Sequence, residues 1–151
     1  AEIARQVTDI RQKAAQNQHQ VRIGVNGFVV ARDTEQQAQQ VIRDIVARAN
    51  PEAVKGFADQ VTNAGKASPE GEGNWANSGF EDLVQYNDGF KSNLIGTPQQ
   101  IAERIIEFKN AGADLLLLGF LHFQEEVAWF GQEILPRVRE LERQQQFTAS
   151  H

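Results

Sequence analysis

Two apolar segments of the chain carry the residues with the clearest chemical potential. Asn26 and Phe28 lie within 21–31, VRIGVNGFVVA, and Phe120 and His122 close the apolar run that starts at Leu115. A buried amide is costly unless it hydrogen-bonds a partner or a ligand, and a histidine beside a ligand can exchange protons near neutral pH. These residues therefore predict a ligand site that combines an amide, aromatic rings and an imidazole.

Ordinary structural roles compete with these interpretations. Asn26 can satisfy a neighbouring backbone group, and His122 can be a half-exposed histidine that caps the next helix. Glu125 and Glu126 would then complement the dipole of that helix. The residue types leave both interpretations open and identify no catalytic residue.

A Gly-, Ser-, Pro- and Asn-rich stretch carries two further candidates. Trp75 lies inside 63–79, and Lys91 precedes the short apolar segment 93–96. Long loops inside compact domains often have a function, so we predict an insertion or lid over 63–93 that closes on a strand-end pocket. The alternative is that Trp75 packs its loop onto the body of the domain.

Several familiar signatures are missing from the sequence. Residues 64–68, AGKAS, fail as a phosphate loop because Gln60 stands where a glycine is needed and Ala67 follows the lysine. No G-x-G-x-x-G follows a strand, no nucleophile elbow is present, and the three histidines lack metal-ligand spacing. We therefore expect no metal site, no dinucleotide fingerprint and no Ser–His–Asp hydrolase.

Strands and helices alternate along the chain. The expected helices are 3–14, about 34–49, 52–63, 98–111 and 123–145, the last bent at Pro136, and the expected strands are 21–31, 93–96 and 114–121. Two helix starts repeat, TEQQ at 34–37 and TPQQ at 97–100. In the first, Asp33 or Thr34 is the N-cap with Gln36 or Gln37 at the reciprocal position, and in the second Thr97 is the N-cap.

This alternation predicts an α/β fold with parallel strands. Strand 114–121 is apolar on both faces, as in sheets that are covered on both sides. Right-handed crossovers between such strands build either an open doubly wound sheet or a (β/α)8 TIM barrel. Because the first helix lacks a preceding strand, we predict a partial barrel, with 1–151 as the C-terminal part of one domain and Asn26 and Phe28 on its inner face.

Composition bounds the class of protein. The chain has 151 residues, of which 40% are hydrophobic and 23% charged, as in one globular domain. Its net charge of −5 and lack of a basic stripe argue against nucleic acid, and no apolar run is long enough for a membrane span. The absence of Cys suits the cytoplasm. Because the chain lacks Met and begins inside a helical pattern, we expect a piece of a longer polypeptide.

Longer motifs carry a family resemblance over about residues 3–143. The segments are NGFVVARDT, RANPEAVKGFADQV, GKASPEGEGNWANSGFEDLVQYNDGFKSNLIGTPQQIAERI and LLLLGFLHFQEEV. Together they resemble the bacterial-luciferase-like flavin monooxygenases and, within them, the dimethylsulfone monooxygenases. SPEGEG with EDLVQYNDGF is the most specific part, whereas LIGTPQQIAERI is shared across the wider family.

The resemblance implies a (β/α)8 barrel enzyme more than twice as long as this chain, with its flavin-phosphate site largely outside it. Such enzymes take reduced FMN from a separate NAD(P)H-dependent flavin reductase. With dioxygen they oxidise a carbon next to sulfur, which would convert dimethylsulfone into methanesulfinate and formaldehyde. The chain alone would then be inactive.

The resemblance also assigns site residues. Related alkanesulfonate monooxygenases carry Arg and His where this chain has Asn26 and Phe28, and Tyr where it has Phe120. A sulfonate needs a guanidinium, but a small neutral sulfone needs only hydrogen-bond donors and apolar contacts. Lys91 lies near a loop arginine of those relatives and is expected to hold the loop over the flavin.

Two alternatives stay open at this stage. The parent could be an alkanesulfonate or another flavin- or deazaflavin-dependent monooxygenase of the same family. The chain could instead be a non-catalytic partial barrel. As a partial barrel, the chain would have unpaired strand edges and an exposed inner face, which predict a homo-oligomer.

Overall fold

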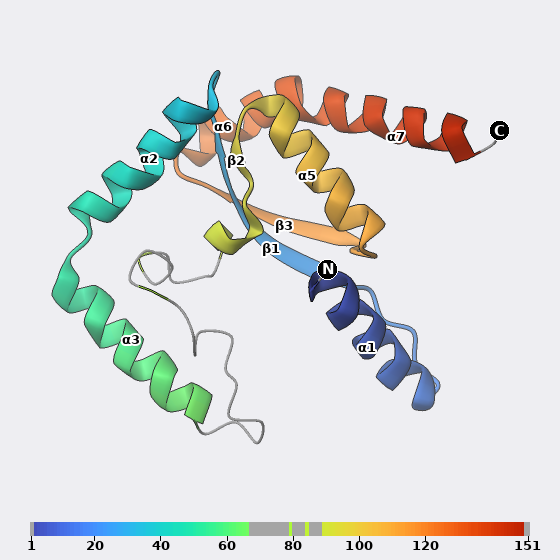
Figure 1. Ribbon diagram of the computed structural model, residues 1–151, viewed down its shortest axis with the longest axis horizontal. Coiled ribbons are helices and arrows are strands. Elements are labelled where there is room, and N and C mark those ends of the chain that lie inside the picture. Colours follow the sequence, from blue (N-terminus) through green and yellow to red (C-terminus); the bar gives the residue numbers. More distant parts are fainter. Residues whose placement is uncertain (1, 67–78, 80–83, 85–88, 150–151) are drawn as a thin grey trace.

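A computed structural model describes residues 2–66, 79, 84 and 89–149. Its elements are, in chain order, α1 (Glu2–Gln16), β1 (Gly24–Ala31), α2 (Glu35–Arg48), α3 (Pro51–Lys66), η1 (Gly89–Ser92), β2 (Ile95–Gly96), α5 (Pro98–Asn110), β3 (Leu115–Phe120), α6 (Phe123–Trp129), η2 (Phe130–Ile134) and α7 (Leu135–Ala149). Figure 1 shows α2 and α3 following one another on one side of the sheet, with α5 crossing the strands and α7 leading away to the C-terminus. The predicted alternation of strands and helices is confirmed.

The three strands form one parallel sheet in the order β2-β1-β3. β1 pairs with β3 over six residues, from Gly24 opposite Leu115 to Val29 opposite Phe120. Its other edge pairs only Val30 and Ala31 with β2. The prediction of parallel strands joined by helical crossovers is therefore confirmed.

The strand order differs from that of a barrel segment. Consecutive barrel strands would lie in the order β1-β2-β3, whereas here β1 is central and β3 pairs with it directly. β2 has only two residues in the ladder and β1 has eight, so a central β1 satisfies more backbone N–H and C=O groups than a central β2 could. The described chain thus has an open three-stranded sheet, and the predicted barrel segment is not confirmed.

One face of the sheet is covered by helices. Its core is built from these buried residues: Val29, Ala31, Leu94, Ile101, Ala102, Ile106, Phe108, Phe130, Ile134 and Val138. They come from β1, the residue just before β2, α5 and the η2–α7 segment, and Leu116, Leu118 and Phe120 of β3 pack against them. Burial of this apolar surface is the main stabilising term for the described domain.

Both repeated helix starts form the predicted capping boxes. Thr34 accepts a hydrogen bond from the Gln37 N–H, and the Gln37 side chain accepts one from the Thr34 N–H. Thr97 and Gln100 make the same reciprocal pair of hydrogen bonds at the start of α5. After the end of this helix, Gly112 has a φ of +97°. Of the two possible N-caps of the first helix, Asp33 or Thr34, the structure selects Thr34.

The long C-terminal helix is interrupted just before Pro136. Residues Phe130–Ile134 form a π-helical turn, in which the Leu135 N–H donates to the Phe130 carbonyl. Proline has no N–H for the carbonyl four residues earlier, and its ring clashes with that carbonyl. At the predicted bend the structure has a widened turn that ends two residues before the proline. Among the described helices, none is both long and apolar enough to cross a membrane.

Asp114 joins the amino ends of the two long strands to α1. Its carboxylate accepts hydrogen bonds from the Ile23 N–H at 2.8 Å and from Arg11 Nη2 at 3.0 Å. The backbone hydrogen bond from Ile23, helped by Arg11 and by the charge of Arg22, lowers the pKa of Asp114 below its ordinary value of 3.8. One carboxylate thereby aligns the start of β3 with the start of β1 and holds the first helix beside them.

Candidate functional site

The sheet face opposite the core carries two of the predicted site residues. We call it the open face and define it by Gly24, Asn26 and Phe28 of β1 and Leu115 and Leu117 of β3. Register places Asn26 beside Leu117 and Phe28 beside Gly119. Leu115 and Leu117 are 63% and 68% exposed, and Asn26 is exposed as well. Asn26 and Phe28 therefore share one accessible, mainly apolar face, as their spacing predicts.

Burial on the open face increases toward the carboxyl end of β1. Asn26 is exposed, Phe28 is partly buried and Val30 is fully buried. Phe28 meets Phe90 of η1 edge to face, with 5.5 Å between ring centroids. Lys91, the next residue of η1, is exposed. The structure thus brings Phe28 next to the turn that carries Lys91, while Asn26 lies in the amino-terminal half of the strand.

Phe120 lies on the other face of the sheet. It is paired with Val29, so the two side chains share the helix-covered side, and its ring packs edge to face on Phe130 at 5.6 Å. Phe28 is paired with Gly119 instead. The structure therefore does not bring Phe28 and Phe120 together. Trp75 and most of the predicted 63–93 lid lie outside the described residues.

Arg32, which follows β1, joins the end of that strand to the end of β2 and to α6, the helix after β3. Its backbone N–H donates to the Gly96 carbonyl at the end of β2, at 3.0 Å. Its guanidinium Nη1 donates to Glu126 Oε1 of α6 at 3.0 Å and to the Ala31 carbonyl. The side chains of Arg32 and Glu126 are only 29% and 17% exposed, so water screens this ion pair less than the surface pairs of the helices.

His122 is held by the same carboxylate. It occupies the N-cap position of α6, and its backbone N–H donates to Glu126 Oε2 at 3.0 Å. Its own carbonyl accepts from the Glu126 N–H at 2.9 Å. The His122 side chain makes no capping hydrogen bond and is exposed. His122 thus occupies the predicted N-cap position, but its side chain does not cap the helix, and its imidazole is accessible.

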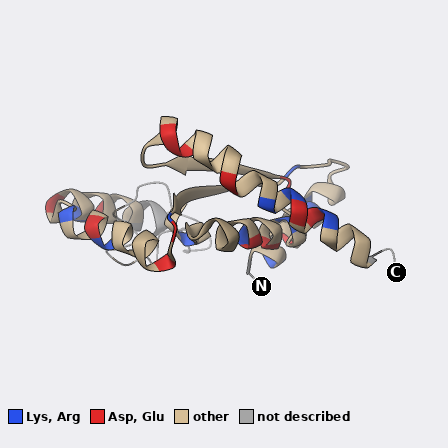
Figure 2. Cartoon of the chain, turned by 90° about the horizontal axis from the view of Figure 1, so that it is seen from above, with Lys and Arg blue, Asp and Glu red and all other residues tan. Residues whose placement is uncertain are grey.

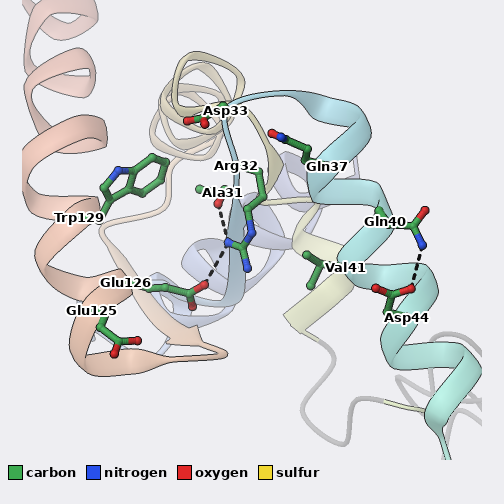
Figure 3. Close-up of a pocket in the computed structure, with 10 residues that line it drawn as sticks. All are labelled: Ala31, Arg32, Asp33, Gln37, Gln40, Val41, Asp44, Glu125, Glu126 and Trp129. Carbon is green, nitrogen blue, oxygen red and sulfur yellow. Dashed lines mark hydrogen bonds and ion pairs between the residues drawn. The ribbon is translucent and has the colours of Figure 1, made fainter.

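A cavity of about 640 Å³ lies between α2 and α6, beside this ion pair. Figure 3 shows Arg32 reaching toward Glu126, with Trp129 on the α6 side and Gln40 and Asp44 on the α2 side. The lining residues are Ala31, Arg32, Asp33, Gln37, Gln40, Val41, Asp44, Glu125, Glu126 and Trp129. Its lining has four carboxylates and one guanidinium, which is already paired, so this cavity does not suit a phosphate.

Charge elsewhere is confined to the helices and connections. Figure 2 shows Lys and Arg interspersed with Asp and Glu along the helices, whereas the strands are uncharged. Within the described ranges, no three His, Asp or Glu side chains are grouped so that they could hold a metal ion.

The ion pair between Arg32 and Glu126 could not be identified from sequence motifs or from the alternation of strand faces. Glu126 was interpreted as a helix-dipole residue, and its place in the first turn of α6 agrees with that. Its partner could have been sought in the first charged residue after β1, because parallel strands end at the same edge. No local spacing connects the two residues, which are 94 positions apart.

Comparison with known proteins identifies the family. The family model described as luciferase-like monooxygenase matches residues 1–115, about three quarters of the chain, so the chain belongs to this family. It is 68% identical, over 142 residues, to an FMNH(2)-dependent dimethylsulfone monooxygenase of Pseudomonas putida, covering 94% of this chain and 39% of that protein. It is 67% identical, over 144 residues, to the protein of the same name from Pseudomonas fluorescens (strain Pf0-1), covering 95% of this chain and 40% of that protein. The chain thus spans about two fifths of the length of these curated relatives.

Proposed function

We propose that this chain is part of a flavin monooxygenase that uses reduced FMN and dioxygen to convert dimethylsulfone into methanesulfinate and formaldehyde. The observation that carries the proposal is the 68% identity, over 94% of the chain, to a protein named for this activity. Within a longer polypeptide, the three βα units would belong to a (β/α)8 barrel, in which the strand order would have to differ from the β2-β1-β3 order of this sheet. A separate NAD(P)H-dependent reductase would supply the reduced flavin.

The described residues fit the flavin ring better than its phosphate. The open face offers exposed Leu117 and partly buried Phe28 to a flat apolar ring, and Asn26 as a hydrogen-bonding group. The carboxylate-rich cavity beside Arg32 would repel a phosphate, so the phosphate is expected to lie on residues other than these. Asn26, Phe28 and Leu117 would therefore contact the ring or the substrate beside it.

The mechanism requires little proton chemistry from this chain. Reduced FMN, when bound, supplies two electrons and two hydrogens for dioxygen, one atom of which ends in formaldehyde and the other in water. The Asn26 amide would orient a sulfone oxygen, and Phe28 would contact a methyl group. Once covered within the longer polypeptide, this apolar face would also keep water away from the reacting carbon. The substrate is neutral, so Asn26 needs no charge to hold it.

The proposal is tested with a chimera in which this chain replaces the matching region of the Pseudomonas putida relative. Formaldehyde release from dimethylsulfone is measured with reduced FMN from an independent reductase, first in air and then without it. Dioxygen-dependent formaldehyde is the expected result. Tight FMN binding without product would overturn the substrate assignment, and failure to bind FMN by a folded chimera would overturn the flavin function itself. The unaltered relative is the control for the assay.

A further inference from the structure

Arg32 joins the carboxyl ends of β1 and β2 to α6, the helix that follows β3. It follows β1 directly, its backbone N–H reaches Gly96 at the end of β2, and its guanidinium reaches Glu126 beyond β3. Carboxyl ends of parallel strands are the edge at which α/β enzymes bind their ligands. The Arg32 backbone therefore fixes β1 against β2, and its side chain fixes the end of β1 against α6.

Glu126 contacts His122 through both its carboxylate and its backbone N–H. Its carboxylate divides its two oxygens between Arg32 and the His122 N–H, and its own N–H holds the His122 carbonyl. The backbone of His122 is thereby held on both sides, with φ −118° and ψ 76° outside the helical region. The His122 imidazole makes no hydrogen bond to the helix cap. The Glu126 carboxylate binds the His122 N–H instead, and the imidazole is accessible.

We propose that Arg32 and Glu126 are positioning residues, which place the His122 imidazole at the carboxyl edge for contact with the bound substrate or flavin. This inference rests on the proposed monooxygenase function. An Arg–carboxylate pair of low exposure is suited to the role because its hydrogen bonds are directional and only weakly screened. Glu126 acts through His122 and does not itself touch the reacting atoms.

The first experiment tests the position of His122 without any activity. Hydrogen exchange of the His122 amide is followed by NMR in the 151-residue chain and in two variants, Glu126→Ala and Glu125→Ala. Glu125 lies in the same helical turn and is the matched control. Removing a charge-assisted bond is expected to speed exchange by about tenfold in Glu126→Ala, with little change in the control. Equal exchange in both variants would overturn the proposed contact.

The second experiment tests whether position matters for turnover. In the chimera, kcat and KM for dimethylsulfone are measured for Glu126→Ala, His122→Ala and the double variant. We expect each single change to lower kcat by roughly three- to tenfold and the double change to lower it no further, because Glu126 acts through the imidazole. Arg32→Lys should retain more activity than Arg32→Gln. Losses that multiply in the double variant would overturn the positioning role.

The two experiments separate this inference from the function on which it rests. An inactive wild-type chimera would overturn the proposed function, and the exchange measurement would then decide the His122 contact alone. An active chimera whose kcat is unchanged in Glu126→Ala would leave the function standing and overturn the positioning role. A loss of about 10²–10⁴-fold in His122→Ala would go further and make His122 a general acid or base.

Discussion

At the residue scale, Asn26 is the side chain expected to set the preference for a neutral over an anionic substrate. Replacing Asn26 by Arg in the chimera should lower kcat/KM for dimethylsulfone by about tenfold, because a neutral sulfone offers no counter-charge to compensate the guanidinium for its lost hydration. The same change should improve turnover of a short alkanesulfonate by about the same factor, since a charge-assisted bond then forms.

The measurement is a competition between the two substrates, with Gln20→Arg as a control for added charge. Gln20 is exposed and precedes β1, so its substitution adds the same charge away from the open face. Unchanged selectivity in Asn26→Arg would show that Asn26 does not face the substrate.

Also at this scale, the stability contribution of Asp114 should depend on pH. Its pKa is lowered in the folded state, chiefly by the Ile23 N–H, so the unfolded chain binds more protons near its ordinary value of 3.8. The contribution is present above pH 3.8 and is lost as the pH falls through the lower folded pKa. Urea unfolding between pH 5 and pH 2 should therefore show a shallower pH dependence for Asp114→Asn than for the wild type. Identical pH dependence in the two proteins would contradict a lowered pKa of Asp114 in the folded state.

Two side chains show how far residue patterns can predict a site. Alternation within β1 correctly placed Asn26 and Phe28 on one face, because the side-chain period of a strand is two. The position of Phe120 depends on the register between β1 and β3, and pairing with Val29 puts it on the opposite face. Periodicity inside a segment cannot provide that register, since it is set by contacts between distant residues.

At the element scale, the two capping boxes predict a local and measurable stability term. Thr97→Ala removes the side-chain acceptor of the Gln100 N–H and should lower the free energy of unfolding by about 1 kcal/mol. Thr97→Ser keeps the acceptor and should cost less. Urea denaturation of the 151-residue chain measures both variants, and an equal loss in the two would exclude the cap as the cause.

The helix caps and the interruption of the C-terminal helix could be predicted because the residues that interact there are close in sequence. Thr34 bonds a group three residues away, and Pro136 acts on the preceding helical turn. The central position of β1 depends instead on which strand offers the longest ladder. β2 contributes only Ile95 and Gly96 to the sheet, a length that the NLIG segment alone does not reveal.

At the scale of the whole molecule, the open face is the feature expected to control association. Leu115 and Leu117 are largely exposed on an edge strand, and such surfaces favour contact with other chains. The 151-residue chain should therefore form homo-oligomers at micromolar concentration, and Leu115→Lys with Leu117→Lys should shift it toward monomer. Sedimentation velocity measures the change, with Val127→Lys on α6 as the control. A monomeric wild type would contradict this expectation.

The pairing of β1 with β3 also has a consequence for how the chain acquires its structure during synthesis. Ile23 and Asp114, which are bonded at the start of the two strands, are 91 residues apart in sequence. A contact of that separation has a large loop-closure entropy and forms slowly. β1 is therefore translated long before β3, and Val29 lacks its partner until Phe120 has left the ribosome. Until then this apolar strand is a segment of the nascent chain to which a chaperone can bind.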